Sequence, residues 1–198
     1  AALDKAKTLT ELEDIYRPYK QHRKTRASAA REKGLEPLAA LLLEQKENYG
    51  KTIEEIAKEY MDEEKEVNSA EDALAGARDI IAEDISDSAD YRREIRAITW
   101  RAGSITTKQI KEGSSPYENY YDYTEKLSSI PNHRILAVNR AEKEEYIRVS
   151  VTVEPSLILN FLADRILGSP KSPAYNHVIS AITDSYERLI APSIEREL

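Results

Sequence analysis

A helical pattern of apolar residues runs through the segment AEDALAGARDIIAEDI, residues 70–85. Apolar side chains recur there three and four positions apart, a spacing that places them along one side of an α-helix. Ser69 directly precedes the segment, and its hydroxyl can accept a hydrogen bond from a free backbone N–H group of the first turn. The sequence therefore predicts a capped helix with one apolar face, formed by Ala73, Leu74, Ala77, Ile80, Ile81 and Ile85.

Further helices are predicted on both sides of this segment. ADYRREIRAITWRAG indicates a helix over residues 89–103, and the short connection predicts that it forms an antiparallel pair with the preceding one. Later helices are expected over residues 156–167 and from residue 174 to the end, the last with a kink at Pro192. Towards the N-terminus, the pairs Thr8 with Glu11 and Thr52 with Glu55 are spaced as capping boxes, which mark helix starts.

Proline and glycine mark the ends of the first helices. Pro18 disfavours helical backbone at the residue before it, so the first helix should end near Tyr16. A second helix over residues 27–33 is closed by Gly34. Pro37 suits the first turn of a third helix, where its missing N–H would have no partner.

The composition agrees with a helical protein. Only six of the 198 residues are glycine and eight are proline, while 40% are hydrophobic and 33% are charged, which is typical of a folded chain. There is no cysteine, which excludes disulfides and thiolate metal sites and fits a cytoplasmic location. No apolar run approaches the roughly 18 to 20 residues of a membrane span, so no membrane association is expected.

One segment changes from helical spacing to strict alternation. Ile147, Val149, Val151 and Val153 alternate with polar residues, the period of a half-buried strand. HRILAVNR is the predicted partner strand and AEKEE the loop, which gives a β-hairpin over about residues 134–153. The expected fold class is mainly α, a multi-helix assembly of antiparallel helix pairs with this one small hairpin.

Two subdomains are expected. Residues 1–68 would form an N-terminal helical subdomain with a basic loop at 17–33 and an acidic linker at 62–68. Residues 69–198 would form a second helical subdomain that contains the hairpin and ends in helices leading toward a downstream domain.

Catalytic and metal-binding patterns are absent from the sequence. The three histidines are scattered and lack metal-ligand spacing, and no glycine-rich phosphate loop or nucleophile elbow occurs. Carboxylates are so abundant that neighbouring pairs indicate a solvated surface. The sequence predicts no enzyme activity and no cofactor.

A tyrosine cluster allows two interpretations. Tyr117, Tyr120, Tyr121 and Tyr123 could stack on nucleobases, as aromatic residues do in single-strand binders. They could equally pack between helices and strands. Acidic residues between them would repel a phosphate backbone, which favours packing.

The segment IYRPYKQHRKTRASAAREKGLEPL is the best candidate for a binding site. Five cations and no carboxylate lie between residues 17 and 26, although the chain has a net charge of -7. Such a local excess of positive charge can attract polyanions. The candidate nucleic-acid-binding residues are Arg17, Lys20, Arg23, Lys24, Arg26 and Arg31.

Other interpretations of this basic stretch stay open. The cations could be a solvated loop, or they could pair with the acidic region at 52–72. The stretch could also be an intramolecular docking surface, because a guanidinium group can satisfy several buried acceptors at once.

Four segments together resemble the Tex family of bacterial transcription accessory proteins, in the helical part that precedes its YqgF-like domain. They are spread over the chain in one order: IYRPYKQHRKTRASAAREKGLEPLA, GARDIIAE, YYDYTEKLSSIPNHRILAVNRAEKE and YERLIAPSIERE. The resemblance implies a mostly helical, non-catalytic, cytoplasmic scaffold associated with nucleic acid, with the transcription machinery as a possible partner. It also implies that RNA binding resides largely in a downstream OB-fold domain, so the alternative is a protein-interaction module that orients such domains.

The chain departs from the family pattern at two positions. The family usually has glycines where this chain has Ala141 and Glu145. Since non-glycine residues tolerate a positive φ poorly, the loop is expected to use another conformation here.

Overall fold

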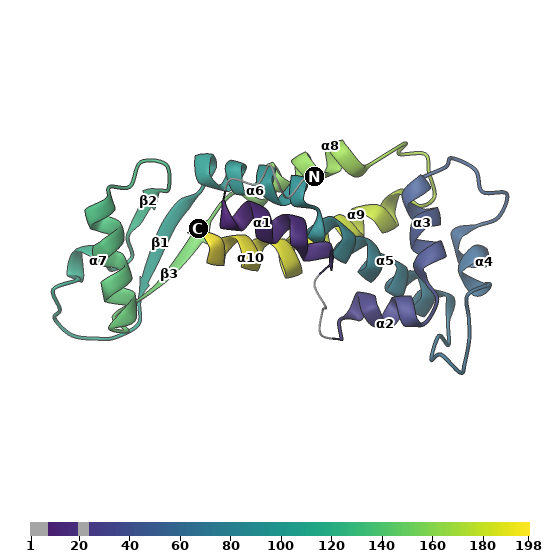
Figure 1. Ribbon diagram of the computed structural model, residues 1–198, viewed down its shortest axis with the longest axis horizontal. Coiled ribbons are helices and arrows are strands. Elements are labelled where there is room, and N and C mark those ends of the chain that lie inside the picture. Colours follow the sequence, from purple (N-terminus) through teal and green to yellow (C-terminus); the bar gives the residue numbers. More distant parts are fainter. Residues whose placement is uncertain (1–7, 20–23) are drawn as a thin grey trace. The chain divides into compact units, whose positions relative to one another are not determined.

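The computed structural model describes residues 8–19 and 24–198, which are mainly α-helical with one small antiparallel sheet (Figure 1). The predicted mainly α fold class is thereby confirmed. The chain forms two compact units. The first comprises the described residues up to Arg93 together with Leu159–Pro192, and the second comprises Glu94–Ile158 and Ser193–Leu198.

Helix α5, Ala70–Asp87, is the centre of the first unit. All six residues of its predicted apolar face are buried. Its main neighbours are four helices and a π-helical segment: α2 (Arg26–Glu32), α3 (Glu36–Glu44), α4 (Ile53–Lys58), α9 (Tyr175–Asp184) and Ser185–Ile190. One apolar face thus organises segments that are far apart in the sequence.

The predicted helix starts are confirmed where their side chains are described. Thr52 and Glu55 form a capping box at α4, each side chain accepting a hydrogen bond from the other's backbone N–H. Ser69 Oγ accepts from the backbone N–H of Asp72 over 3.0 Å at the start of α5. The first helix, α1 (Leu9–Tyr16), begins directly after Thr8, whereas the side chain of Glu11 lies outside the described residues.

The predicted helix ends are also confirmed. α1 stops at Tyr16 and continues into a 3₁₀ turn, Arg17–Tyr19. Gly34 has a φ of +83° and closes α2. Its N–H donates to the carbonyl of Arg31, and the N–H of Leu35 donates to the carbonyl of Ala30, which is the paired pattern of a Schellman motif.

The C-terminal helix is interrupted just before the predicted kink at Pro192. α9 runs into the π-helical segment Ser185–Ile190, and α10 follows over Ala191–Glu197. The N–H of Ala191 donates to the carbonyl of Tyr186, five residues earlier, so the wide turn ends next to the proline.

The second unit contains a three-stranded antiparallel sheet in the order β2-β1-β3. Its register sets Ser104 opposite Lys126 of β2 and opposite Thr152 of β3. The remaining elements, two of which run across the boundary between the units, are α6 (Ala89–Ala102), β1 (Ser104–Gln109), β2 (Thr124–Lys126), α7 (Asn132–Lys143), β3 (Ile147–Thr152) and α8 (Pro155–Ile166).

The predicted hairpin over about 134–153 is wrong in its first strand. β3 is a strand, but HRILAVNR belongs to helix α7. Ile135, Val138 and Ala141 recur at helical spacing, and α7 packs them into the core beneath the sheet. The true partner of β3 is β1, whose sequence SITTKQ has a single large apolar residue and therefore no alternating hydrophobic signal.

The expectation for Ala141 and Glu145 is also wrong. Ala141 is buried inside α7, and Glu145 itself has a φ of +61°. The N–H of Glu145 donates to the carbonyl of Glu142, and the N–H of Tyr146 donates to the carbonyl of Ala141. These bonds repeat the Schellman motif of α2 with glutamate in the glycine position.

Three of the four tyrosines of the cluster pack into or against the core of the second unit, as the packing interpretation predicted. Tyr117 is buried there, and its ring lies 5.6 Å from that of Tyr146. Tyr120 and Tyr121 pack against the same core. The hydroxyl of Tyr117 donates to Glu144 at the end of α7.

The expected subdomain boundary between residues 68 and 69 stays a prediction. In the described residues, α2, α3 and α4 on one side of it pack against α5 on the other. The expected antiparallel pairing of α5 with α6 also stays a prediction.

Candidate functional site

Four of the six candidate cations lie in described residues. Arg17 is in the 3₁₀ turn after α1, Lys24 precedes α2, and Arg26 and Arg31 are at the two ends of α2. Thr25 positions α2, because its side chain and that of Ser28 form a capping box. The remaining two candidates, Lys20 and Arg23, lie outside the described residues.

Arg31 is held by two carboxylates of α5. Its Nη1 donates to Glu83 Oε1 over 2.7 Å, and its Nη2 donates to Asp84 Oδ1 over 2.5 Å. Burial alone would lower the pKa of Arg31, but the hydrogen bond with Glu83 and the charges of both carboxylates raise it above its ordinary value. Glu83 is almost completely buried, so Arg31 supplies the positive charge that makes this burial tolerable.

Arg17 makes a similar contact at the end of the same helix. Its Nε donates to Asp87 Oδ1 over 3.0 Å. Carboxylates near a helix C-terminus are repelled by the partial negative charge of the free carbonyls, and the last turn of α5 has no basic residue of its own. The positive charges of Arg17 and Arg31 offset this repulsion. The alternative in which the cations pair with the acidic region at 52–72 therefore does not hold for these two, whose partners lie at 83–87.

Lys24 and Arg26 are exposed. Among the described residues, no ion pair includes either of them. The positive charge of Arg26 acts at a distance on Asp79, whose pKa is nevertheless raised because burial outweighs the nearby charges of Arg188 and Arg26. The described candidate cations therefore divide into Arg17 and Arg31, which form ion pairs inside the first unit, and Lys24 and Arg26, which face solvent.

A second charged cluster was not predicted from the sequence. Arg188, on the π-helical segment, donates from Nη2 to Asp79 over 3.2 Å and to Asp184 over 2.5 Å. These ion pairs connect the π-helical segment and α9 to α5. π-helical turns insert an extra residue and occur often at functional positions, but the sequence has no reliable signal for them.

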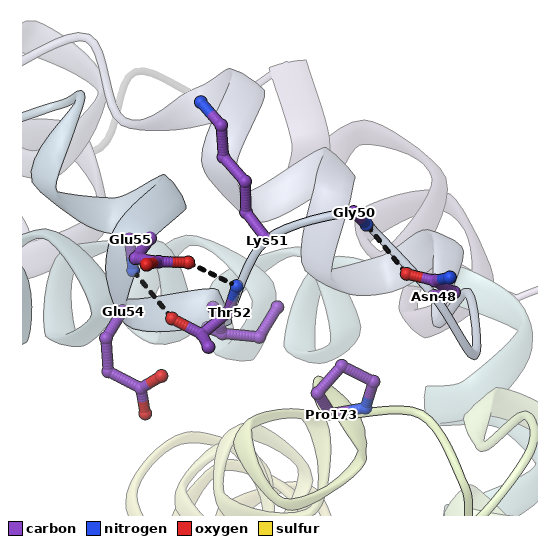
Figure 2. Close-up of a pocket in the computed structure, with 8 residues that line it drawn as sticks. Asn48, Gly50, Lys51, Thr52, Glu54, Glu55 and Pro173 are labelled. Carbon is purple, nitrogen blue, oxygen red and sulfur yellow. Dashed lines mark hydrogen bonds between the residues drawn. The ribbon is translucent and has the colours of Figure 1, made fainter.

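A shallow hollow lies at the start of α4, lined by residues 48 and 50–52 of the preceding loop, by residues 53–55 of the first helical turn and by Pro173 (Figure 2). Figure 2 shows that its polar groups form hydrogen bonds with one another. Thr52 and Glu55 form the capping box, and the N–H of Gly50 donates to Asn48 Oδ1 over 2.7 Å. Lys51 pairs with Glu59. These contacts stabilise the loop and leave few donors for a ligand.

Within residues 8–19 and 24–198, no group of three or more histidine, aspartate or glutamate side chains could hold a metal ion. In the same part of the chain, no helix is both long and apolar enough to cross a membrane.

Comparison with known proteins agrees with the resemblance. Residues 48–189 match the family model described as Tex central region-like. The chain is 41% identical to the uncharacterized protein YdcI of Bacillus subtilis over 202 residues, covering 99% of this chain and 28% of that protein. It is 37% identical to the protein tex of Bordetella pertussis over 156 residues, covering 77% of this chain and 19% of that protein.

A more distant relative is the human S1 RNA-binding domain-containing protein 1. It is 27% identical over 212 residues, covering 99% of this chain and 21% of that protein. The chain thus spans less than a third of the length of each of these relatives. The family model covers more than half of the chain, and the chain belongs to the Tex family, to whose central region it corresponds.

Proposed function

We propose that this chain is a non-catalytic helical scaffold within a Tex-type transcription accessory protein. In this role the basic stretch connects the N-terminal helices to α5 by ion pairs. The observation that carries the proposal is Arg31, which forks between Glu83 and Asp84. Because Arg31 is held by these two carboxylates, it stabilises the packing of α2 on α5 and is poorly placed to bind a phosphate group instead.

The names of the relatives support the setting of the proposal. One is the transcriptional accessory protein Tex of Neisseria gonorrhoeae, and the human relative is named for an S1 RNA-binding domain. We infer that the whole protein acts in the cytoplasm with nucleic acid and the transcription machinery. This chain would orient the domains that bind them.

The substitution Arg31→Ala tests the scaffold role. It leaves Glu83 buried without its cation, which should lower the free energy of unfolding by about 1 to 2 kcal/mol. Arg26→Ala is the matched control, because it removes the same charge from an exposed position of the same helix and should change stability by less than about 0.5 kcal/mol. Equal stability of the two variants would contradict the scaffold role of Arg31.

Direct contact of the basic stretch with nucleic acid is the second candidate function. The exposure of Lys24 and Arg26 favours it. Reversing the charges of Lys20, Arg23, Lys24 and Arg26 should then weaken binding and reduce its salt dependence by about 0.7 to 0.9 log units per lost phosphate contact. If binding were unchanged, these cations would contact solvent and not nucleic acid.

A further inference from the structure

One face of the sheet in the second unit is polar and uncovered. Side chains alternate along each strand, and Ile105, Thr107, Val149 and Val151 lie on the face that packs with α7. The opposite side, which we call the hydroxyl-cation face, is partly or fully exposed. It consists of Ser104, Thr106, Lys108, Thr124, Lys126, Arg148, Ser150 and Thr152.

The charge of this face is entirely positive. It carries Lys108, Lys126 and Arg148 and no carboxylate, in a chain whose net charge is -7. No ion pair among the described residues includes any of the three cations. The nearest acidic residue on β2, Glu125, is on the other face, where it binds Arg134.

The register places two of these cations against each other. Lys108 of β1 lies directly opposite Arg148 of β3. Like charges in directly opposed positions destabilise an antiparallel pair. The repulsion would be relieved by an anion bound over the two strands.

The hydroxyl groups suit the same kind of ligand. Thr106 and Thr152 donate to backbone carbonyls of the neighbouring strand. The side-chain hydroxyls of Ser104, Thr124 and Ser150 make no hydrogen bond to other described residues. Serine and threonine hydroxyls, together with lysine and arginine, are common donors to phosphate oxygens in nucleic-acid complexes.

The edge of the sheet argues against a peptide strand as the ligand. β3 is an edge strand, and its outward N–H groups at Val149 and Val151 donate to Glu142 Oε1 and Glu195 Oε1. A peptide that extends the sheet would need these donors. The face also has no aromatic side chain on which a base could stack, so contacts would be to the backbone of the nucleic acid.

We propose that the hydroxyl-cation face binds the phosphate backbone of nucleic acid without reading its sequence. The binding energy would come from Lys108, Lys126 and Arg148, and the hydroxyls would fix the position of the backbone. These residues differ from those of the basic stretch. A test of this site is therefore independent of the scaffold role proposed for Arg31.

The test is a salt titration of the 198-residue chain with labelled duplex DNA and labelled single-stranded RNA. Reversing Lys108, Lys126 and Arg148 to glutamate should weaken binding by at least about tenfold near 0.1 M salt and reduce the slope of log affinity against log salt by about 2 to 3. Lys171→Glu is a matched control, because it makes one such reversal at an exposed loop position of the first unit and should have a much smaller effect.

Lys108→Glu alone separates binding from folding. It places a carboxylate opposite Arg148, so Tm should stay the same or rise while affinity for both nucleic acids falls. The proposal is overturned if the wild-type chain binds neither the DNA nor the RNA at about 50 mM salt. It is overturned as well if the variant with all three cations reversed binds as tightly as the wild type. It is also overturned if polyglutamic acid competes as well as the nucleic acids, since that would indicate an acidic protein as the partner.

Discussion

Arg92 donates from Nε to Asp14 Oδ1 over 2.8 Å, and the arginine side chain is completely buried. The pair joins α1 to the start of α6. A charge at such depth is stable only when opposite charge and hydrogen bonds surround it. Each residue has further contacts, including a 3.5 Å approach of Arg92 Nη1 to the carbonyl of Ser86.

Removing one partner of this pair should be far more harmful than removing both. We expect Arg92→Met and Asp14→Leu each to lower the free energy of unfolding by about 3 to 5 kcal/mol, because the remaining charge is left buried. The double variant should recover much of that loss. Urea unfolding of the four proteins measures this, and additive losses would show that the two charges are not coupled.

Gly76 allows α2 and α5 to approach closely. A Cβ atom at this position would collide with the end of Leu35, which is buried, and would lie 3.2 Å from Ala30 Cβ. Alanine favours helix by about 1 kcal/mol over glycine, but overpacking a closed core costs about 1 to 3 kcal/mol. We therefore expect Gly76→Ala to destabilise the chain by up to about 2 kcal/mol. In a Leu35→Ala background the same change should become neutral or stabilising, and a loss of equal size there would rule out the steric explanation.

Glu145 occupies a left-handed backbone position at the end of α7. This conformation costs a non-glycine residue roughly 1 to 2 kcal/mol, and glycine avoids that cost. Glu145→Gly should accordingly raise the free energy of unfolding by up to about 1 kcal/mol, measured by thermal or urea unfolding. Lys143→Gly, two residues earlier in regular helix, should instead lower it, and a loss of stability in both variants would contradict this account.

Helices were predictable from the sequence where local chemistry determines them. Capping residues such as Thr52, breakers such as Gly34 and the apolar spacing along α5 all act within a few residues of their own position. β1 was missed because its partner strand is about 40 residues away and its own residues are mostly hydroxylic and charged. α7 was misread because a short apolar run with two β-branched residues, Ile135 and Val138, fits either helix or strand.

The candidate site was predicted as a charged segment but not as a set of contacts. A local excess of cations is visible in the sequence, whereas the partners of Arg17 and Arg31 are brought close only when the 3₁₀ turn and α2, respectively, pack against α5. Nothing in the sequence indicated that Arg92 and Asp14 form a buried ion pair, because charged residues are usually exposed. The hydroxyl-cation face depends on strand register, which follows from tertiary packing.

His177 should make stability depend on pH. Its Nδ1 lies 3.2 Å from Arg78 Nη1, and since arginine can only donate, Nδ1 accepts and the ring is neutral in this contact. Burial and the charge of Arg78 lower the pKa of His177, against the weaker opposing effect of Glu71 and Glu54. Arg78 also binds Glu71, so protonated His177 would face a cation already fixed in place.

Because the pKa of His177 is lower in the folded chain, the unfolded chain binds more protons as pH falls below the ordinary histidine value of about 6.5. The contribution of the neutral ring to stability is therefore complete above that pH and is lost as pH falls toward the folded pKa. We expect His177→Gln to flatten the pH dependence of stability between about pH 7 and 5, while His133→Gln, at an exposed position, serves as the control. Urea unfolding across this range measures it, and parallel pH profiles for His177→Gln and wild type would exclude His177 as the titrating group.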